Sequence, residues 1–529
     1  MMSTPFPPPL VSDTLGALDH VRSLDRFTPE RREILAEAII ADLDRWGAPD
    51  EARRSANALR YDSGCAVVTG QQAGIAGGPL YTIYKALGTI VAARTLQEHR
   101  TDLRIVPLFW IESDDHDFDE ARALGLIDRN GAHQTIHYDD GDRLRRSIGD
   151  RPISPRGIER LLQQLREVLP ETDFIGEAFE LLVDSYRADN GATLADGFAR
   201  FLYRLLGSTP LIIVSSRNPV MKRLAVDILE MEAHDPDPMY RALEKTTRKN
   251  RMQGMPTPID PKKGSLFLTH QGERRSLDVD DDGYVARGTG VRYSRDDVAR
   301  IARETPERLS PNVALRPVVQ DAAIPTMLYL AGPTERAYHG QLGDVYSRFG
   351  LPQPAVAPRP SALLLEPKAV RAIEGGPLDL AELLQRDLDI SSRLIDPTAS
   401  EAIEKTQIAS VQRIRETWDG WRQMVMEIDP TLEKAIGAGS AAGVKEMENL
   451  ARKLRAALKR RQETSIRRLE GIRAILLPGG MPQERGLNVI GFIARYGLAA
   501  VRAALGQIVP TEGLCVVRLD LYNAAIMLR

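Results

Sequence analysis

The sequence predicts an α/β protein with a parallel sheet at its core and a long helical hairpin in its carboxyl-terminal part. Short apolar runs alternate with helical patterns over residues 60–360, as in parallel sheets that helices cover on both faces. A glycine-rich loop joins the first of these runs to a helix. Beyond residue 408, apolar residues recur at alternating spacings of three and four, which is the heptad pattern of a coiled coil.

Composition places the chain among ordinary globular proteins. Its 529 residues allow roughly two to four domains, its apolar content is 43%, and its formal net charge is −3. That charge gives no electrostatic reason to expect nucleic acid or an acidic membrane surface as a partner. The sequence shows no signal peptide and no apolar run of about 18 residues that could span a membrane. Because only Cys65 and Cys515 occur, a reducing compartment is favoured, and we expect a cytoplasmic protein.

The amino-terminal part predicts helices followed by one strand–loop–helix unit. Residues 10–60 show helical periodicity, with Leu35, Ile39 and Leu43 on one face. Another face carries Leu15, Leu18, Val21 and Leu24. Cys65–Thr69 is typical of a strand, and the loop "TGQQAGIAGGP" follows it. A helix is expected to begin near Pro79, because proline is favoured at the first helical position.

Four further strands and two insertions complete the predicted core. The strands are expected at Arg104–Ile111, within Pro210–Pro219, within Ile324–Tyr338 and around Ala355–Ala357. The connections are too long for simple crossovers, so we predict a helical insertion near residues 130–205. A second insertion near residues 235–310 is expected to hold a small antiparallel sheet. The whole core domain is expected to span residues 1–375.

Residues 376–529 are predicted to form an α-helical coiled-coil domain whose last segment returns to the core. The apolar seam of its first helix consists of Val411, Ile414, Trp418, Trp421, Val425, Ile428 and Leu432. The stretch "GAGSAAG" (Gly437–Gly443) is expected to break the helix, and a second helix to run from about Val444 to Leu477. Because the seam of the second helix is interrupted, it cannot cover the first one completely. We therefore predict a homodimer formed through the hairpins.

Carboxylates crowd the end of the second predicted strand. In "VPLFWIESDDHDFDEA" (Val106–Ala121), His116 lies among Glu112, Asp114, Asp115, Asp117, Asp119 and Glu120. Ligands of open α/β sheets bind beyond the carboxyl ends of the strands, so this cluster and the glycine-rich loop are expected to share one cleft. Asp115, His116 and Asp117 are the candidate catalytic residues, which would bind a substrate ammonium group and accept its proton. A metal site and a solvated loop are the alternatives.

The glycine-rich loop has the character of an anion-binding site. It lacks the Gly-Lys-Ser/Thr ending of a Walker A motif, but its glycines, its two glutamines and the following helix start suit a phosphate or a carboxylate. The residues expected to take part are Gly70, Gln71, Gln72, Gly77, Gly78, Tyr81, Thr82 and Lys85. Valine at Gly77 or Gly78 is expected to leave the fold intact and to block the anion. The alternative is a tight connection without a ligand.

Two later segments supply further candidates for substrate binding. These are "PNVALRPVVQDAAIPTMLYLAGPTERAYHGQLGDVY" (residues 311–346) and "APRPS" (residues 357–361). Their candidate residues are Arg316, Gln320, Glu335, Tyr338, Arg359 and Ser361. Arg316 and Arg359 are expected to hold substrate carboxylates. Helix capping and hydrogen bonding in the core are the alternative roles.

Four motifs resemble the bacillithiol-biosynthesis cysteine-adding enzyme family, BshC. They are "TGQQAGIAGGPLYTIYKA", "PLFWIESDDHDFDE", "RPVVQDAAIPTMLYLAGPTERAY" and "LLPGGMPQER". The resemblance covers nearly the whole chain. It implies a Rossmann-like core of the nucleotidyltransferase type, two connecting insertions and a coiled coil that makes a homodimer. The implied activity is a ligase that adds L-cysteine to glucosaminyl-malate, the last step toward bacillithiol.

The resemblance leaves the use of ATP open. Class I aminoacyl-tRNA synthetases, which share the implied core, bind ATP with His-Ile-Gly-His and Lys-Met-Ser-Lys-Ser signatures, and this chain has neither. No metal site is predicted. Two other functions stay open at this point, a metal-dependent hydrolase built on the Asp/His cluster with His133 and His137, and a non-catalytic coiled-coil adaptor.

Overall fold

The computed structural model describes residues 26–394, 397–510 and 513–519. The chain divides into two compact units, of which one comprises Lys368–Gly480 and the other comprises the residues before and after it. The sequence placed this boundary after residue 375 and expected the last segment to return to the core. The second face predicted for residues 10–60, with Leu15, Leu18, Val21 and Leu24, lies outside the described residues.

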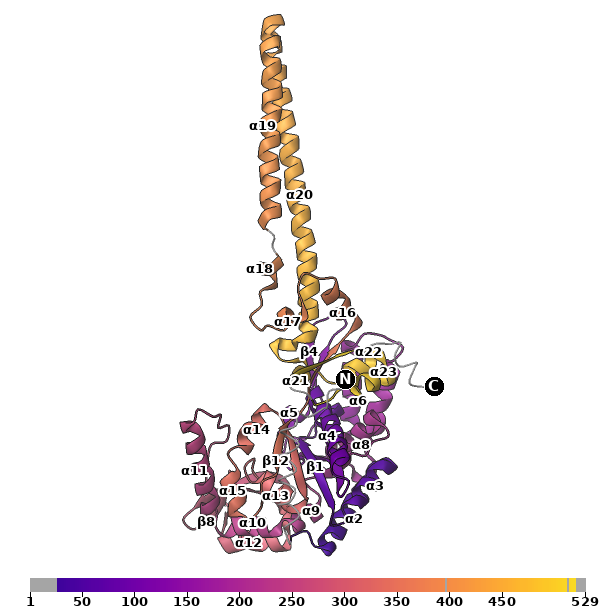
Figure 1. Cartoon of the computed structure of the whole chain (residues 1–529), viewed down its shortest axis with the longest axis vertical. Coiled ribbons are helices and arrows are strands. Elements are labelled where there is room, and N and C mark those ends of the chain that lie inside the picture. The colour runs from indigo at the N-terminus through magenta and orange to yellow at the C-terminus, as the bar shows by residue number, and fades with distance from the viewer. Residues whose placement is uncertain (1–25, 395–396, 511–512, 520–529) are drawn as a thin grey trace. The chain divides into compact units, whose positions relative to one another are not determined.

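Five parallel strands form the central sheet of the first unit, in the order β12-β11-β1-β2-β5. They are β1 (Gly64–Gln71), β2 (Arg104–Ile111), β5 (Ile212–Ser215), β11 (Thr326–Ala331) and β12 (Ala355–Pro358). Two of them, β1 and β12, are labelled in Figure 1. Each of the five strands that the sequence predicts is present in this sheet. The predicted α/β class with a parallel, Rossmann-like core is therefore confirmed.

Apolar side chains hold the sheet to the helix that follows β1. Helix α4 (Leu80–His99) begins after Pro79, as expected, and directs Ala92, Ala93 and Leu96 into a buried cluster. Strand residues of the same cluster include Cys65, Val67, Leu328 and Leu330. This packing fixes where β1 ends and α4 begins, and so fixes the loop between them.

Two helices precede the sheet. Helix α2 (Pro29–Trp46) starts at a Thr28 cap and ends at Gly47, whose φ of 65° lies in the left-handed region that suits glycine. Leu35, Ile39 and Leu43 are buried along it, as their spacing predicts. Helix α3 (Asp50–Ala58) then leads into β1.

The first insertion lies between β2 and β5. Its elements are α5 (Phe118–Ala121), β3 (Ala123–Ile127), β4 (His133–His137), α6 (Pro155–Val168), α7 (Ile175–Ser185) and α8 (Leu194–Leu206). The helices match the predicted helical insertion. The antiparallel pair β3–β4 was not predicted.

The second insertion follows β5 and contains the small antiparallel sheet that the sequence predicts. Helices α9 (Pro219–Leu224), α10 (Val226–His234) and α11 (Asp237–Met252) precede it. The sheet has the order β10-β6-β7-β8-β9. Its members are β6 (Leu266–His270), β7 (Glu273–Asp280), β8 (Gly283–Ala286), β9 (Arg292–Tyr293) and β10 (Leu309–Pro311), with α12 (Arg295–Glu304) before β10. The chain then returns to the central sheet through α13 (Arg316–Ala323), and α14 (Pro333–His339) and α15 (Gly343–Arg348) lie between β11 and β12.

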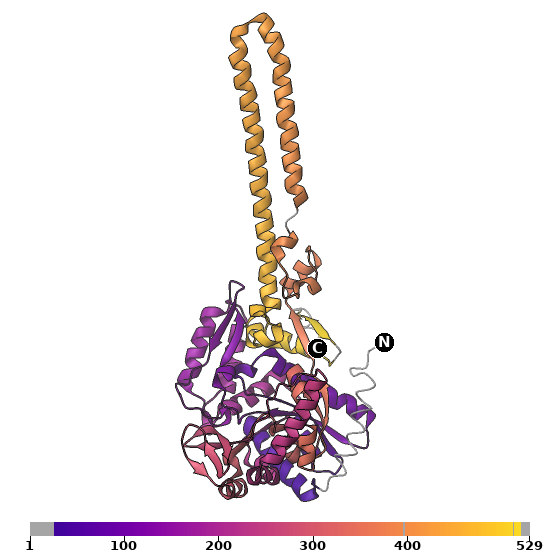
Figure 2. The same ribbon diagram turned by 90° about the vertical axis from the view of Figure 1, so that its left-hand side faces the viewer.

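The second unit is dominated by two long antiparallel helices. Helices α19 (Pro397–Ile428) and α20 (Glu433–Leu476) lie side by side in Figure 1, and Figure 2 shows the turn that joins them. The short helices α16 (Pro367–Glu374), α17 (Leu380–Leu383) and α18 (Ile390–Leu394) precede them. The predicted coiled-coil hairpin is therefore present.

The predicted break at Gly437–Gly443 is wrong, because these residues lie inside α20. The chain turns earlier, at Asp429, whose carboxylate accepts a hydrogen bond from the Thr431 N–H, and at Pro430, which cannot continue a helix. This helical position requires glycine, because a Cβ at Gly439 would lie 2.3 Å from the ring of Trp418. The glycine therefore makes room for an indole of the facing helix.

The last segment of the chain packs within the first unit. It contains α21 (Gln483–Gly486), α22 (Ile490–Tyr496), α23 (Leu498–Leu505) and β14 (Leu514–Arg518). Strand β14 pairs in parallel with β13 (Ser361–Leu365). Within the described residues, no helix combines the length and the apolar character that crossing a bilayer requires.

Candidate active site

A cavity of about 440 Å³ lies beyond the carboxyl ends of β1, β2 and β11. Phe267, Arg274 and Pro311 of the second insertion reach this edge of the sheet. Ligands of open α/β sheets bind at this edge. Its lining residues are Gly70, Gln71, Gln72, Glu112, Asp115, His116, Phe267, Arg274, Pro311, Asn312, Val313, Arg316, Tyr329, Glu335 and Tyr338. Eight residues that the sequence proposes for the site are in this lining: Gly70, Gln71, Gln72, Asp115, His116, Arg316, Glu335 and Tyr338.

The glycine-rich loop and the acidic segment meet at one contact. The side-chain amide of Gln72 donates a hydrogen bond to Asp115 Oδ2. The other oxygen, Oδ1, accepts from the backbone N–H of His116 at 2.7 Å and of Asp117 at 3.2 Å. The prediction that both segments share one cleft is confirmed by this contact.

His116 lies between two arginines. Its Nδ1 is 3.2 Å from Arg274 of β7, and its Nε2 is 2.6 Å from Arg145 of the first insertion. Burial lowers the pKa of His116, and the charge of Arg274 lowers it further. A neutral imidazole accepts a hydrogen bond at only one nitrogen, so one of the two arginines takes that lone pair and leaves none for a substrate proton.

The remaining carboxylates of the acidic segment have separate roles. Asp117 is exposed and caps α5, where its Oδ1 accepts from the Glu120 N–H at 3.2 Å. Asp114 is fully buried, forms an ion pair with Lys222 of α9, and lies 3.5 Å from Arg217. Repulsion between these carboxylates is limited, because each has its own hydrogen-bond donors or cations.

Glu112 extends into the cavity from the end of β2. Its Oε2 lies 3.2 Å from the Trp110 indole N–H and 3.7 Å from Nε of Arg316. Burial raises the pKa of Glu112 to about 7, against the opposing effect of Arg316. The sequence placed Glu112 in the acidic cluster but did not select it as a site residue.

Arg316 is held in place by hydrogen bonds to polar side chains. Its guanidinium donates to the hydroxyl of Tyr338 at 3.0 Å and to Oε1 of Gln320 at 3.3 Å. It also lies over the ring of Tyr329, 5.9 Å from the centroid. Gln320 is fully buried behind the cavity, so it orients Arg316 instead of lining the site.

Lys85 acts from behind the cavity wall. Its ammonium contacts Glu335 Oε2 at 2.6 Å, the carbonyl oxygen of Gly70 at 2.7 Å and Oε1 of Gln71 at 3.0 Å. Three donors thus meet three acceptors. Burial lowers the pKa of Lys85. Burial would raise the pKa of Glu335, but the Lys85 ammonium, the Gly332 N–H and Arg316 together hold it below its ordinary value. Lys85 was expected to bind an anion directly, and in the structure a protein carboxylate is its partner.

Tyr81 and Thr82 lie beside the cavity without lining it. The Tyr81 hydroxyl accepts from the side chain of Gln71 at 3.1 Å, and burial raises the pKa of Tyr81 to about 12. Its ring is flanked by the guanidinium groups of Arg359 and Arg485, which lie 5.3 and 5.7 Å from the centroid. Thr82 is fully buried in the first turn of α4.

Gly77 and Gly78 are packed inside the protein. They have φ values of 82° and 69°, and a Cβ at Gly77 would lie 3.0 Å from the ring of Phe201. The side-chain amide of Asn488 donates to the carbonyl oxygen of Gly78 at 2.8 Å. The expectation that valine at these positions leaves the fold intact therefore does not hold, because the positive φ favours glycine at both positions and the space at Gly77 is also too small for a side chain.

Arg359 and Ser361 bind a carboxylate of the protein itself. Both terminal nitrogens of Arg359 contact Glu484 of α21, at 2.6 and 3.1 Å, and the Ser361 hydroxyl donates to the same carboxylate at 2.9 Å. The pair is buried. Arg359 was predicted to bind a substrate carboxylate. In the structure it binds Glu484 instead, and so holds the last segment of the chain against the first unit.

Comparison with known proteins defines the family. The chain matches the N-terminal Rossmann-like domain of the bacillithiol biosynthesis protein BshC over residues 17–360, and the C-terminal coiled-coil domain over residues 362–514. The chain belongs to the BshC family.

Curated relatives in this family are named "Putative cysteine ligase BshC". The protein of Chlorobaculum tepidum is 32% identical and is aligned over 88% of this chain and 85% of its own length. The protein of Salinibacter ruber is 31% identical, over 89% and 86%. Among solved structures, a putative arginyl-tRNA synthetase from Campylobacter jejuni aligns with 84% of this chain and 92% of its own, but its TM-score of 0.22 and 11% identity are too low to support an argument.

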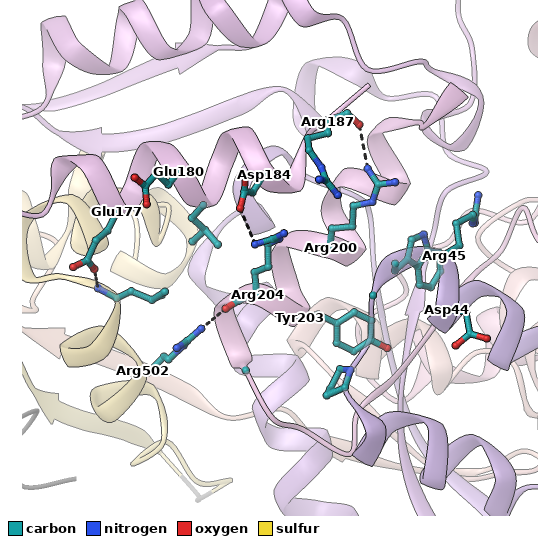
Figure 3. A pocket seen from close by; sticks show the side chains of 16 residues that line it. Asp44, Arg45, Glu177, Glu180, Asp184, Arg187, Arg200, Tyr203, Arg204 and Arg502 are labelled. Carbon is teal, nitrogen blue, oxygen red and sulfur yellow. Dashed lines mark hydrogen bonds and ion pairs between the residues drawn. The ribbon is translucent and has the colours of Figure 1, made fainter. Parts of the chain in front are cut away.

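A second cavity of this BshC family member, of about 790 Å³, is lined by residues of α2, α7, α8 and α23 (Figure 3). Several of its charged side chains are engaged by the protein: Arg204 contacts Asp184 at 2.9 Å, and Arg502 donates to the carbonyl oxygen of Leu205 at 2.9 Å. None of the residues that the sequence proposes for the site lines it. The candidate site is therefore placed in the first cavity.

The hydrolase alternative gains nothing from the geometry of this BshC family member. Among the residues that the structure describes, no group of three or more His, Cys, Asp or Glu side chains is arranged to hold a metal ion. His133 of β4 contacts the carbonyl oxygen of Gly486 at 3.1 Å, and neither it nor His137 lines the cavity.

Proposed function

We propose that this BshC family member joins L-cysteine to glucosaminyl-malate through an amide bond, as the last step of bacillithiol biosynthesis. Membership of the family and the cysteine-ligase names of the relatives support a ligase. We place the reaction in the cavity beyond β1, β2 and β11. We also propose a cytoplasmic location, which fits two cysteines of which neither is in a disulfide.

The observation that carries the proposal is that the cavity wall contains both negatively and positively charged side chains. Glu112 and Asp115 offer carboxylates, while Arg316 and Arg274 offer guanidinium groups, all within one cavity of about 440 Å³. Both reactants carry an ammonium group and at least one carboxylate. Carboxylates attract the former and a guanidinium fork binds the latter. Such a cavity therefore suits two zwitterionic reactants better than it suits an apolar ligand.

Amide formation sets two requirements, an activated carboxyl group and a neutral amine. In the proposed arrangement, Asp115 faces the ammonium of glucosaminyl-malate, and Arg316 faces a carboxylate. The buried contacts of Lys85 keep Gln71 and Glu335 in position, so that the polar wall is formed before the reactants bind. The agent that activates the carboxyl group is left to experiment, since the chain has no recognised ATP signature.

The direct test incubates the purified protein with L-cysteine and glucosaminyl-malate, with and without ATP, and follows the product by mass spectrometry. We expect a product whose mass is the sum of both reactants less one water. Comparison of the two arms shows whether a nucleotide activates the carboxyl group. Absence of the product in both arms would contradict the proposal, and so would unchanged bacillithiol in a host from which the gene is deleted.

We further propose that the protein is a homodimer through its second unit. Several large apolar side chains of α19, α20 and the turn between them are exposed, including Trp421 at 55% and Ile428 at 76%. Others are Ile408, Met424, Leu432, Leu450 and Leu454. Exposed large apolar side chains in this number favour a protein interface, and the heptad seam suits a second copy of the same hairpin.

The adaptor alternative predicts that the core binds no small molecule. Thermal unfolding with and without glucosaminyl-malate separates the two functions, because a ligand that binds the native state raises the melting temperature. A shift that disappears in Arg316→Met would favour the ligase.

A further inference from the structure

We propose that Glu112 is the group that accepts the proton from the attacking amine in the reaction proposed above. The inference rests on the proposed function. It assigns the role to a residue outside the set that the sequence selected, Asp115, His116 and Asp117.

The neighbouring groups are already engaged. Asp117 caps α5 from an exposed position, and His116 has an arginine at each ring nitrogen. Asp114 is buried in its ion pair with Lys222 and does not line the cavity. Asp115 accepts hydrogen bonds at both oxygens, from Gln72 at Oδ2 and from two backbone N–H groups at Oδ1. Each of these contacts occupies a lone pair that a substrate proton would need.

Glu112 differs because its contacts are on one oxygen. The Trp110 indole and the Arg316 guanidinium both approach Oε2. In the part of the chain that the structure describes, no hydrogen bond involves Oε1. The residue lines the cavity, so a bound amine can reach this oxygen without displacing a protein donor. Trp110 and Arg316 meanwhile fix the direction in which the carboxylate points.

The surroundings of Glu112 also give its carboxyl group a pKa that suits a general base. Burial raises the pKa of Glu112 to about 7, and a general base is most effective when its pKa lies near the working pH. The charges that oppose or reinforce this effect come from several elements. They are Arg316 of α13, Lys222 of α9 and Arg274 of β7, which lower the pKa, and Asp114, which raises it. The hydroxyl of Tyr338, which also lines the cavity, is hydrogen-bonded to Arg316.

The proposed step is a single proton transfer that precedes amide formation. The ammonium of glucosaminyl-malate loses one N–H bond, the electron pair stays on nitrogen, and the proton forms an O–H bond with Oε1 of Glu112. The neutral amine then attacks the carbonyl carbon of an activated cysteinyl carboxyl group of the acyl-phosphate or acyl-adenylate class. The C–N bond forms, the nitrogen releases its second proton to solvent water, the bond from carbon to the leaving oxygen breaks, and the leaving group departs with that electron pair.

The test compares Glu112→Gln, which keeps the shape and the contact with Trp110, with Glu112→Asp and with the control Asp119→Asn. Asp119 lies in the same segment and is exposed. Product formation is measured from about pH 5.5 to about pH 9.5, and the affinity for glucosaminyl-malate is measured by calorimetry. Thermal unfolding of each variant shows whether it is folded.

We expect Glu112→Gln to lower kcat at neutral pH by about 100- to 10,000-fold, the usual contribution of general base catalysis. The Kd for glucosaminyl-malate should change by less than about tenfold, since Asp115 still faces the ammonium. The wild-type rate should rise with pH and level off above the pKa of Glu112. The rate of Glu112→Gln should continue to rise, because the solution then supplies the neutral amine. The rate of Glu112→Asp should still level off at high pH, but at a lower value and with its acidic limb displaced from that of the wild type.

Two results would contradict the assignment of Glu112, and a third would contradict the proposed function. A Glu112→Gln variant with the kcat and pH profile of the wild type excludes Glu112 as the acceptor, and so does a variant that loses only affinity. If Glu112→Gln does not fold, the profile of Glu112→Asp decides: a displaced acidic limb supports the assignment and an unchanged limb contradicts it. A wild-type protein that forms no product under any condition contradicts the proposed function itself.

Discussion

The side chain of Gln72 donates a hydrogen bond to Asp115, and so joins the loop after β1 to the segment after β2. These strands are neighbours in the parallel sheet, with Gln71 opposite Ile111 in the register. Because parallel strands end at the same edge, the register itself brings a glycine-rich loop and an acidic segment together. The contact is the structural basis for placing both reactants in one cavity.

Asp115→Asn tests this shared wall. The variant should fold with a melting temperature close to that of the wild type, because Asp115 is only partly buried and an amide retains one oxygen acceptor. Its affinity for glucosaminyl-malate should fall by about tenfold or more, since a charge opposite the ammonium is lost. Calorimetry measures the affinity, with Asp117→Asn as the matched control, because asparagine also caps helices. Equal losses in both variants would contradict the distinction between these carboxylates.

Asp114→Asn should affect stability above all. The change leaves the Lys222 ammonium buried without its carboxylate, and loss of one partner of a buried pair costs about 3–5 kcal/mol. Urea unfolding gives the free energy of unfolding, and the exposed control Asp119→Asn should change it by less than about 0.5 kcal/mol. A small effect at Asp114 would mean that the pair is not important for folding.

Glu232 predicts a pH dependence of stability in the second insertion. The carboxyl is buried and hydrogen-bonded to Ser265, and burial raises its pKa from 4.5 to about 8. The folded state therefore holds this proton more tightly than the unfolded state, and the contribution to stability falls as pH rises from about 4.5 to about 8. Glu232→Gln should remove this dependence and stabilise the protein at pH 8 by on the order of 3 kcal/mol relative to wild type, with little gain at pH 4. Equal unfolding free energies of the two proteins at both pH values would contradict the prediction.

The homodimer is tested on exposed positions of α19. Trp421→Glu combined with Ile428→Glu should give monomers in light scattering, because charge replaces apolar surface that a second hairpin would cover. Both side chains are exposed within the chain, so the hairpin itself should remain helical by circular dichroism. Gln423→Glu, on an exposed position of the same helix, is the control. A double variant that stays dimeric would place the contact elsewhere.

The strands of the central sheet could be predicted because continuous β-branched and apolar runs are typical of buried parallel strands. The pair β3–β4 was missed, since its strands are short and "HQTIH" is mostly polar. The helix break was misplaced because glycine has a low helix propensity. The sequence pattern does not show that the ring of Trp418 packs against position 439. This contact requires glycine within the helix.

About half of the candidate site residues could be predicted because they follow the ends of strands. The roles of the others depend on partners far away in the sequence. Lys85 pairs with Glu335, and Arg359 with Glu484, so two cations that suggested ligand binding are neutralised within the protein. Arg274 reaches the cavity from the second insertion, and no local pattern signals that approach. Glu112 stood in the acidic segment, but only its one-sided contacts in the fold separate it from its neighbours.

The most direct measurement is a crystal structure of the protein with glucosaminyl-malate bound. Our account predicts the ligand in the cavity beyond β1, β2 and β11, with its ammonium near Glu112 and Asp115 and a carboxylate within hydrogen-bonding distance of Arg316. Ligand bound elsewhere, for example in the cavity lined by α7 and α8, with the Glu112–Arg316 cavity left empty, would contradict it.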